Sequence, residues 1–368
     1  MDTPRFIGSE VYRGSSYGAW HPLRIPRVPT VMDLARALGW LPAAAYVTSP
    51  RAKPAALQMW HTPRYIAALQ RAEATGTVDA ETRARHGLGT TANPVFPQVF
   101  RRPATSAGGV MLAAELVARG GVVHAPGGGT HHAFPDRANG FCYINDPVLC
   151  LLALRRLGLE RLIYVDIDAH HCDGVEHAFH GDPHVRLISV HEERRWPFTG
   201  ALEDTAGGAA FNLPVPRSFN DTEMEAVLDR LILPRTAEHR ADAIVLQCGA
   251  DAVAEDPLSR LTLSNNAHRA VALALRNLTP RLIVLGGGGY NPWSVARCWT
   301  GVWGALSGQP IPDRLPDQAE AVLRALSWPG ARAGKNPPEH WFTTLADPPR
   351  PGPLRPEIRD RLTTLARR

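Results

Sequence analysis

The stretch Leu162–Phe179, LIYVDIDAHHCDGVEHAF, begins as an apolar strand and ends in carboxylates and imidazoles. Alternate residues of a strand share a face, so Asp166, Asp168 and His170 would project together if the strand continues through them. Two carboxylates and an imidazole on one side suit a cation. For an isolated Asp-x-Asp pair a salt-bridged or capped strand end is more common than a cation site. Other residues of the chain must therefore decide between these two interpretations.

Chemically active residues also follow other apolar runs. His131 and His132 lie in the glycine-rich loop GGGTHHAFPDRANG, where the backbone can approach a ligand closely. Asp251 follows the run AIVLQCGA, and Tyr290 follows RLIVLGGGG. This recurrence favours a functional site over a capped strand end. The glycine runs contain neither GxGxxG with a suitably placed acid nor a GxxxxGK(S/T) motif, which disfavours phosphate binding.

Asp168, His170 and Asp251 would form a site of one nitrogen and two carboxylate ligands. Three protein ligands leave positions open for water and substrate, which is typical of a catalytic rather than a structural metal site. Zinc is the first choice of metal, and oxygen-rich ligation would also accept ferrous iron or manganese.

The elements that must position these residues alternate from about residue 104, in the pattern of a parallel sheet covered by helices. Ligands bind at the carboxyl ends of the strands in such sheets, where the residues above are found. The predicted strands cover residues 121–126, 161–169, 185–191, 243–250 and 281–289. The predicted helices cover residues 30–41, 61–76, 106–120, 145–158, 221–239 and 265–278.

The domain organisation follows from composition. No linker precedes the predicted sheet, so residues 1–309 are expected to form one catalytic domain. Residues 310–368 are rich in proline and arginine, and are expected to pack on that domain as a surface wrap or to trail from it.

Composition also restricts the class of protein. The 368 residues are 44% hydrophobic, which supplies an ample core. No apolar stretch approaches about 20 residues and the N-terminal residues do not resemble a secretory signal, so we expect a cytoplasmic protein without a membrane segment. The five cysteines include no CxxC pair and are expected to be buried hydrophobes. The net charge is +5, but the arginines are dispersed along the chain, which disfavours a specific nucleic-acid partner.

The sequence resembles the zinc-dependent histone deacetylases and their bacterial relatives, the acetoin-utilisation proteins and acetylpolyamine amidohydrolases. The resemblance implies the arginase/deacetylase fold, a single α/β domain with a central eight-stranded parallel sheet flanked by helices. It covers roughly residues 10–308, through the motifs YGAWHPLRIPRV, WHTPRYIAAL, GGGTHHAFPDRANGFCYINDP, YVDIDAHHCDGVEHAF, LISVHEE, LQCGADAVAEDPL and GGGGYNPWSVARCWT.

The resemblance implies two ion sites. Asp168, His170 and Asp251 match the zinc ligands of the family. Ferrous iron is the alternative metal in the cell. A structural potassium site, formed largely by backbone oxygens, matches Asp166, Asp168, His170, Ser189 and Val190.

It also implies catalytic roles. His131 matches the residue usually treated as the general base, with Asp166 as its orienting partner. His132, paired with Asp173, matches the imidazole that protonates the leaving amine. Tyr290 matches the hydroxyl that donates to the developing oxyanion, a hydrogen bond commonly worth ~3 kcal/mol of barrier.

A narrow tunnel for the acyl-lysine stem is implied as well. Gly140 and Phe141 match one wall, and Gly288 is also assigned to the tunnel. The opposite wall is expected from the loop RRWPFTG, at Trp196 or Phe198.

The sequence departs from the family pattern in three places. Cys172 replaces the glycine of the usual HHGDG motif, and the RRWPFTG loop looks shorter than the common FFPGTG form. Relatives that act on peptides carry an aspartate near Ala92 or Asn93, and this chain has no acid there. Tight, sequence-selective binding of histone tails is therefore not expected. His171 is left without a catalytic role and is expected to be structural.

These observations leave several functions to compare. The leading hypothesis is a zinc amidohydrolase that removes acetyl or short acyl groups from protein lysines, and the alternative is one acting on acetylpolyamines or other small acyl amides. The basic loop YRGSSYGAWHPLRIPR disfavours a cationic polyamine. A ureohydrolase with two manganese ions needs a further bridging acid where Gly249 stands. A catalytically silent acyl-lysine binder would be expected to lack part of the metal set, the histidines or the tyrosine.

Overall fold

Eight strands form one sheet in the computed structural model, which describes residues 3–331 and 333–368. All the strands pair in parallel, in the order β2-β1-β3-β8-β7-β4-β5-β6. The eight-stranded parallel sheet implied by the family resemblance is therefore confirmed. Residues 1–2 of the predicted catalytic domain and Arg332 of the tail lie outside the described residues. The strands are β1 (Arg5–Gly8), β2 (Tyr46–Thr48), β3 (Gly121–Ala125), β4 (Leu162–Asp166), β5 (Val185–Glu192), β6 (Ala210–Val215), β7 (Ala243–Gln247) and β8 (Arg281–Leu285).

The central strands are buried on both faces, which explains why they read as continuous apolar runs. In β4, Ile163 and Val165 enter one hydrophobic cluster while Tyr164 enters the cluster on the opposite face. In β7, Ile244 and Val245 divide in the same way. Helices must therefore cover both faces of the sheet.

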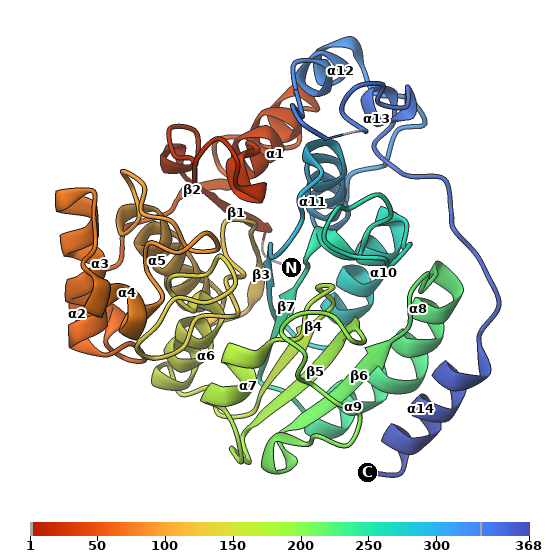
Figure 1. The fold of residues 1–368 in the computed structure, drawn as a ribbon. Helices are drawn as coiled ribbons and strands as arrows, with labels where there is room; N and C mark the ends of the chain where they lie inside the picture. Colours follow the sequence, from red (N-terminus) through yellow and green to blue (C-terminus); the bar gives the residue numbers. More distant parts are fainter. Residues whose placement is uncertain (1–2, 332) are drawn as a thin grey trace.

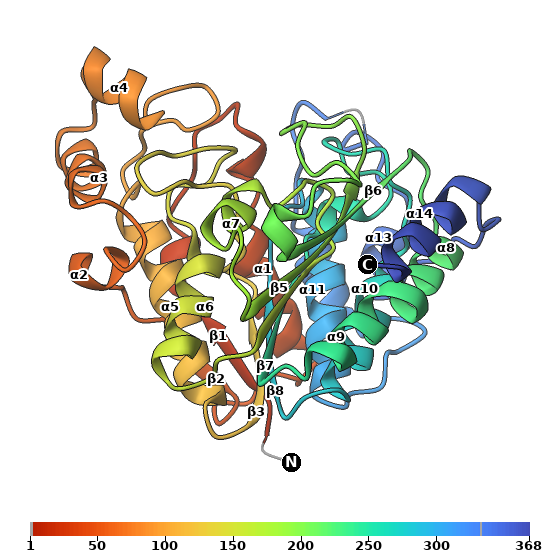
Figure 2. The same ribbon diagram turned by 90° about the horizontal axis from the view of Figure 1, so that it is seen from below.

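Helices α5 and α6 lie on one face of the sheet, and α10 and α11 lie on the other (Figures 1 and 2). Helices α2, α3 and α4 flank the first pair (Figure 1). The helices are α1 (Arg27–Ala37), α2 (Pro54–Leu57), α3 (Pro63–Thr75), α4 (Ala80–His86), α5 (Arg101–Val117), α6 (Asp146–Arg156), α7 (Asp173–Ala178), α8 (Asp221–Val227), α9 (Leu233–His239), α10 (Asn265–Arg276), α11 (Pro292–Leu306), α12 (Asp317–Arg324), α13 (His340–Thr343) and α14 (Pro356–Ala366). None of these described helices is long and apolar enough to cross a membrane.

The segment predicted as one helix over residues 221–239 is divided in the structure. Helix α8 passes into a single π-helical stretch, Leu228–Ile232, before α9 begins at Leu233. Pro234 lacks a backbone N–H and cannot continue an α-helical ladder, so the wider turn accommodates it.

The C-terminal segment lies along the domain and contributes to its core. Leu323 and Trp341 pack into the cluster formed with α1 and α11. Ile358 and Leu362 of α14 pack into the cluster that lines one face of the sheet. In Figure 1 this segment runs from α12 down one side of the molecule to α14.

Candidate active site

Strand β4 ends at Asp166, and the residues after it form tight turns. The Asp168 N–H donates to Asp166 Oδ1 over 2.9 Å, and the His170 N–H donates to Asp168 Oδ1 over 3.0 Å. The predicted strand over residues 161–169 therefore ends three residues earlier than expected, because these carboxylates accept the backbone N–H groups locally. The turns still bring Asp168 and His170 to the carboxyl edge of the sheet.

Asp168, His170 and Asp251 meet at that edge, as the sequence predicted. Their ligand atoms lie within 4.8 Å of one another, and all three side chains are buried. His170 Nδ1 lies 2.9 Å from Asp251 Oδ2 and 3.3 Å from Asp168 Oδ1. Asp166 does not belong to this group, because its carboxylate contacts a histidine instead.

The three donors fit a cation. Burial and the charge of Asp168 raise the pKa of Asp251, so the two carboxylates repel each other unless a positive charge lies between them. The backbone is also fitted closely around them: a Cβ at Gly249 would lie 2.1 Å from Asp168 Oδ2, and one at Gly288 would lie 2.0 Å from Asp251 Oδ2. Only glycine fits these two positions beside the carboxylates.

Each of the paired histidines is oriented by its own carboxylate. His131 Nδ1 lies 2.8 Å from Asp166 Oδ2, and His132 Nδ1 lies 2.6 Å from Asp173 Oδ1. The two imidazole centres are 3.9 Å apart. The Tyr164 hydroxyl also donates to Asp166 Oδ2, over 2.7 Å. These bonds leave both Nε2 atoms unbound to the carboxylates and available for proton transfer.

The two imidazoles differ in their affinity for a proton. Burial lowers the pKa of both, but the charges of Asp166 and Asp168 outweigh it at His131 and raise its pKa to about 9. At His132, burial and the neighbouring charge of His131 lower the pKa to about 4. A cation held by Asp168 would offset part of that residue's effect on His131.

Tyr290 follows β8 and lies against the ring of Phe141, with the ring centres 5.8 Å apart. Its backbone N–H donates to Asp256 Oδ2 over 2.7 Å. Burial, together with the charges of Asp251 and Asp168, raises the pKa of the Tyr290 hydroxyl well above its usual value. The hydroxyl therefore stays protonated and able to donate.

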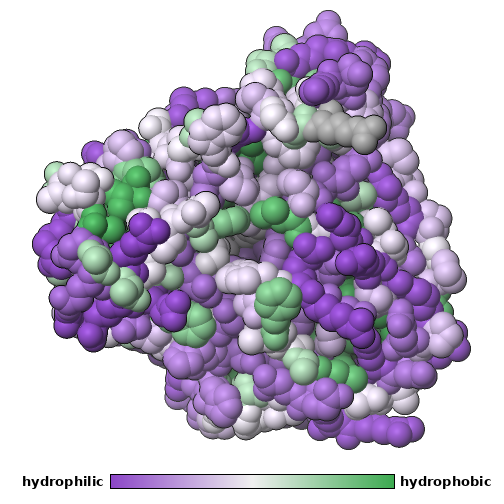
Figure 3. Space-filling model, in the orientation of Figure 1, coloured by the Kyte–Doolittle hydropathy of each residue, from purple (hydrophilic) through white to green (hydrophobic). Residues whose placement is uncertain are grey.

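An outer cavity of about 810 Å³ leads from the surface to His132, His170 and Tyr290. Four of the five predicted tunnel residues line it: Gly140, Phe141, Trp196 and Phe198. Figure 3 shows a hollow near the centre of this face, with hydrophobic side chains at its edge.

The predicted tunnel residues lie at different depths. The Trp196 ring lies 4.6 Å from His132, and a Cβ at Gly140 would lie 2.2 Å from Trp196 Cη2. Phe198 is 73% exposed and lies at the rim. Phe141 adopts a left-handed φ of 69°, and its N–H donates to Asn93 Oδ1 over 2.9 Å. Asn93, in the segment where peptide-binding relatives carry an acid, thus supports the tunnel wall.

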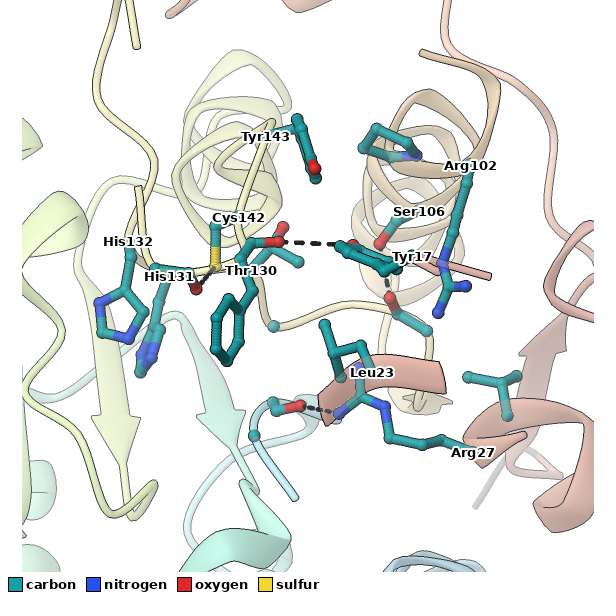
Figure 4. A pocket seen from close by; sticks show the side chains of 18 of the residues that line it. Tyr17, Leu23, Arg27, Arg102, Ser106, Thr130, His131, His132, Cys142 and Tyr143 are labelled. Carbon is teal, nitrogen blue, oxygen red and sulfur yellow. Dashed lines mark hydrogen bonds between the residues drawn. The ribbon is translucent and has the colours of Figure 1, made fainter. Parts of the chain in front are cut away.

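An inner cavity lies beyond the histidines, and Gly288, the fifth tunnel residue, lines this cavity. Figure 4 shows His131 and His132 at one end of it and Arg27 and Arg102 at the other. Arg27 Nη1 donates to the Gly287 carbonyl over 2.6 Å. Neither arginine was predicted as a site residue: Arg27 lies in the motif YGAWHPLRIPRV, which supported only the family resemblance, and Arg102 lies outside the quoted motifs.

Three of the five predicted potassium residues lie on adjacent strands, and the other two, Asp168 and His170, lie in the connection after β4. Asp166 of β4 is in register with Ser189 of β5, and Val190 follows in the same buried strand. The Ser189 hydroxyl lies 2.9 Å from His191 Nδ1. His171 contacts Thr199 and Glu176 at 2.8 and 3.1 Å and faces neither the histidine pair nor the metal group.

The fold and these residues define a class: an α/β protein with a buried cluster of three side chains able to hold a metal at the carboxyl edge of a parallel sheet. A model of the histone deacetylase domain matches residues 21–306. The chain therefore belongs to the histone deacetylase family, as its resemblance implied, and is a metal-dependent, hydrolytic deacetylase.

Individual relatives are similar over most of the chain. The acetoin utilization protein AcuC of Bacillus subtilis (strain 168) is 32% identical over 327 residues, which are 85% of this chain and 84% of that protein. Histone deacetylase 3 of Oryza sativa subsp. japonica is 35% identical over 311 residues, or 82% of this chain and 60% of the longer rice protein. The crystal structure of an HDAC homolog complexed with SAHA superimposes with a TM-score of 0.93 at 33% identity, covering 99% of this chain and 100% of that one. This overlap extends beyond residue 309.

Proposed function

We propose that the chain is a zinc-dependent amidohydrolase that removes acetyl or other short acyl groups from lysine side chains. One observation carries this proposal: two imidazoles, each oriented by a carboxylate, lie beside a buried three-donor group at the base of an open cavity. These are the kinds of group that hydrolysis of an amide requires.

Asp168, His170 and Asp251 are proposed to hold Zn²⁺, with Fe²⁺ as the alternative in the cell. When bound, the ion supplies Lewis acidity that polarises the amide carbonyl and lowers the pKa of water. One ion is favoured over two, because a side chain at Gly249 would collide with Asp168 and leaves no place for a bridging acid. A structural K⁺ is proposed at Asp166, Asp168, His170, Ser189 and Val190.

His131, oriented by Asp166, is proposed as the general base that takes the proton from the attacking water, with a cation at Asp168 offsetting the carboxylate charge that raises the pKa of His131. His132, oriented by Asp173, is proposed to protonate the leaving amine. Tyr290 donates its hydroxyl hydrogen to the developing oxyanion, which its raised pKa permits.

The acyl-lysine stem is proposed to pass between Phe141 and Trp196, with Gly140 and Gly288 leaving room for it and Phe198 at the rim. A small acyl amide, such as an acetylpolyamine, is the alternative substrate. A non-catalytic acyl-lysine binder is the weakest candidate, since the histidines, the metal group and Tyr290 are all present.

We place the protein in the cytoplasm. Its five cysteines are unpaired and buried, which suits a compartment that keeps thiols reduced.

The test is release of acetate by zinc-loaded protein from three kinds of substrate: acetyl-lysine peptides, acetylpolyamines and small acetamides. We expect the peptides to be hydrolysed fastest. Replacing Tyr290 by Phe should lower kcat by about 100- to 1,000-fold, because it deletes the oxyanion donor. No acetate from any of the three would overturn the proposed function.

A further inference from the structure

Five arginines line the outer cavity, although they are dispersed along the sequence. No aspartate or glutamate is found among the described residues that line it. The hollow in Figure 3 accordingly has strongly hydrophilic side chains along one side. The arginines are Arg137, Arg194, Arg195, Arg217 and Arg260.

These arginines come from four separate connections of the fold. Arg137 lies in the loop between β3 and α6, and Arg194 and Arg195 follow β5. Arg217 follows β6, and Arg260 precedes α10. Loops at the carboxyl edge of a parallel sheet converge, so residues up to 123 positions apart in the chain surround one opening.

Most of this positive charge is not neutralised within the part of the chain that the structure describes. Arg195 forms an ion pair with Glu192, with Nη2 2.9 Å from Oε1. Arg260 donates from Nη1 to the Ser259 carbonyl, which carries no charge. The exposed side chains of Arg137, Arg194 and Arg217 form no ion pair in residues 3–331 and 333–368.

Uncompensated guanidinium groups around a concave, partly apolar cavity produce a positive potential that attracts anions and repels cations. Guanidinium also binds carboxylate through two parallel hydrogen bonds, which adds geometric selectivity to charge attraction. A cationic polyamine or a lysine- and arginine-rich peptide would meet repulsion on several sides of the opening. These five arginines, here called the arginine rim, would therefore favour substrates whose groups outside the tunnel carry negative charge.

We infer that the substrate is an acylated lysine flanked by aspartate or glutamate in an acidic peptide segment. This inference rests on the proposed function, because it needs the acyl-lysine to enter the tunnel. The arginines are distributed over several loops and the cavity of about 810 Å³ is larger than an acetyl-lysine stem requires. That distribution matches several separate carboxylates on both sides of the lysine better than one compact anion.

The experiment compares three acetyl-lysine peptides of equal length, with acidic, neutral and basic flanking residues, on zinc-loaded full-length protein. We expect kcat/KM to fall in that order, by about 10-fold or more between the acidic and the basic peptide in low salt. The difference should shrink as salt screens exposed charges. Equal values, or preference for the basic peptide, would overturn the inference while leaving the proposed function intact.

Two variants distinguish the rim from the protein's overall charge. The double variant Arg194→Gln/Arg217→Gln should lower kcat/KM for the acidic peptide by about 3- to 10-fold and change the neutral peptide far less. Arg119→Gln is the matched control, because this exposed arginine precedes β3 at the opposite end of the sheet. An equal effect of both changes would overturn the inference.

Binding provides an independent readout. Anisotropy of the three labelled peptides should rank their affinities in the same order as kcat/KM, so it reports on the rim even in protein that releases no acetate. The absence of acetate release would overturn the proposed function, whereas peptide affinities that do not depend on charge would overturn the inference. Tighter binding of a single-stranded DNA oligomer than of the acidic peptide would also overturn the peptide assignment.

Discussion

The backbone N–H of Tyr290 donates to Asp256 Oδ2 over 2.7 Å. Asp256 is buried, and its other oxygen accepts from the Leu258 N–H over 2.9 Å. One carboxylate thus ties the glycine-rich turn that carries Tyr290 to the loop that carries Asp251. Asp256 touches neither histidine nor any reacting group, so we interpret it as a positioning residue.

Replacing Asp256 by Asn should lower kcat by about 10- to 100-fold with a smaller change in KM, because an amide offers one acceptor oxygen where the carboxylate uses two. The measurement is steady-state kinetics on an acetyl-lysine peptide, repeated in the Tyr290→Phe background. If Asp256 acts by positioning the hydroxyl, the two losses will not add. Additive losses would show that Asp256 acts only through general stability.

Removing the metal should destabilise the fold as well as abolish activity. Chelation would leave the buried carboxylates of Asp168 and Asp251 facing each other, so Tm is expected to fall by about 5 °C or more and to recover when Zn²⁺ is added. The matched variant is Gly249→Ala, whose Cβ would collide with Asp168. Its Tm should not respond to Zn²⁺. A Tm in the parent protein that ignores both chelator and Zn²⁺ would contradict the assigned site.

The sequence predicted the central sheet because its strands are buried on both faces and read as apolar runs. The outer strands were missed by the pattern: β2 has three residues and β1 four, too few for a period to appear, and the edge strand β6 contains Pro214. Likewise, the tail reads as a proline- and arginine-rich surface, yet Trp341 lies buried in it. The buried residues of the tail fall in short helices separated by proline-rich connections, which the overall composition does not reveal.

The site residues that could be predicted from the sequence are those that lie at or directly after the end of a predicted strand. Asp168 and His170 were found from their spacing, and Asp251 from its place after a strand. Asp256 was not found, because it acts on the backbone of a residue 34 positions away, which no local pattern records. The arginine rim was missed for the same reason. Only the parallel topology brings its members together.

Buried neutral histidines should make the protein less stable in weak acid. Burial lowers the pKa of His61 and His124 to about 4, against an ordinary value of 6.5. Below pH 6.5 these two histidines bind protons in the unfolded chain but not in the folded one. Their contribution to the free energy of unfolding is therefore fully present above pH 6.5 and is lost as the pH falls toward 4. Each residue contributes about 3 kcal/mol to this loss.

The measurement is urea unfolding between pH 7 and pH 4.5. His61→Gln should reduce the pH dependence, since the Gln side chain can still accept the Asn145 N–H that bonds to His61 Nε2. The difference between the parent and this variant isolates His61 from the carboxylates that titrate at lower pH. Identical slopes in the two proteins would contradict the prediction.

The C-terminal tail is expected to unfold together with the catalytic domain. Arg297 of α11 is fully buried, and its Nη1 lies 2.7 Å from Asp347 Oδ1 in the tail. The second Asp347 oxygen accepts the N–H of Asn265 at the start of α10, over 3.0 Å. Replacing Asp347 by Asn would leave a buried guanidinium without its counter-charge, at a cost of about 3 kcal/mol.

Urea unfolding followed by tryptophan fluorescence should therefore show one transition, moved to lower urea in Asp347→Asn. The control is Glu81→Gln, which breaks the exposed ion pair between Arg64 and Glu81 and should change stability by less than about 1 kcal/mol. Were the tail an independent extension, Asp347→Asn would leave the main transition in place, because the domain would lose no contact on which its own folding depends. A shift of the whole transition instead makes residues 310–368 part of the same cooperative unit as the site.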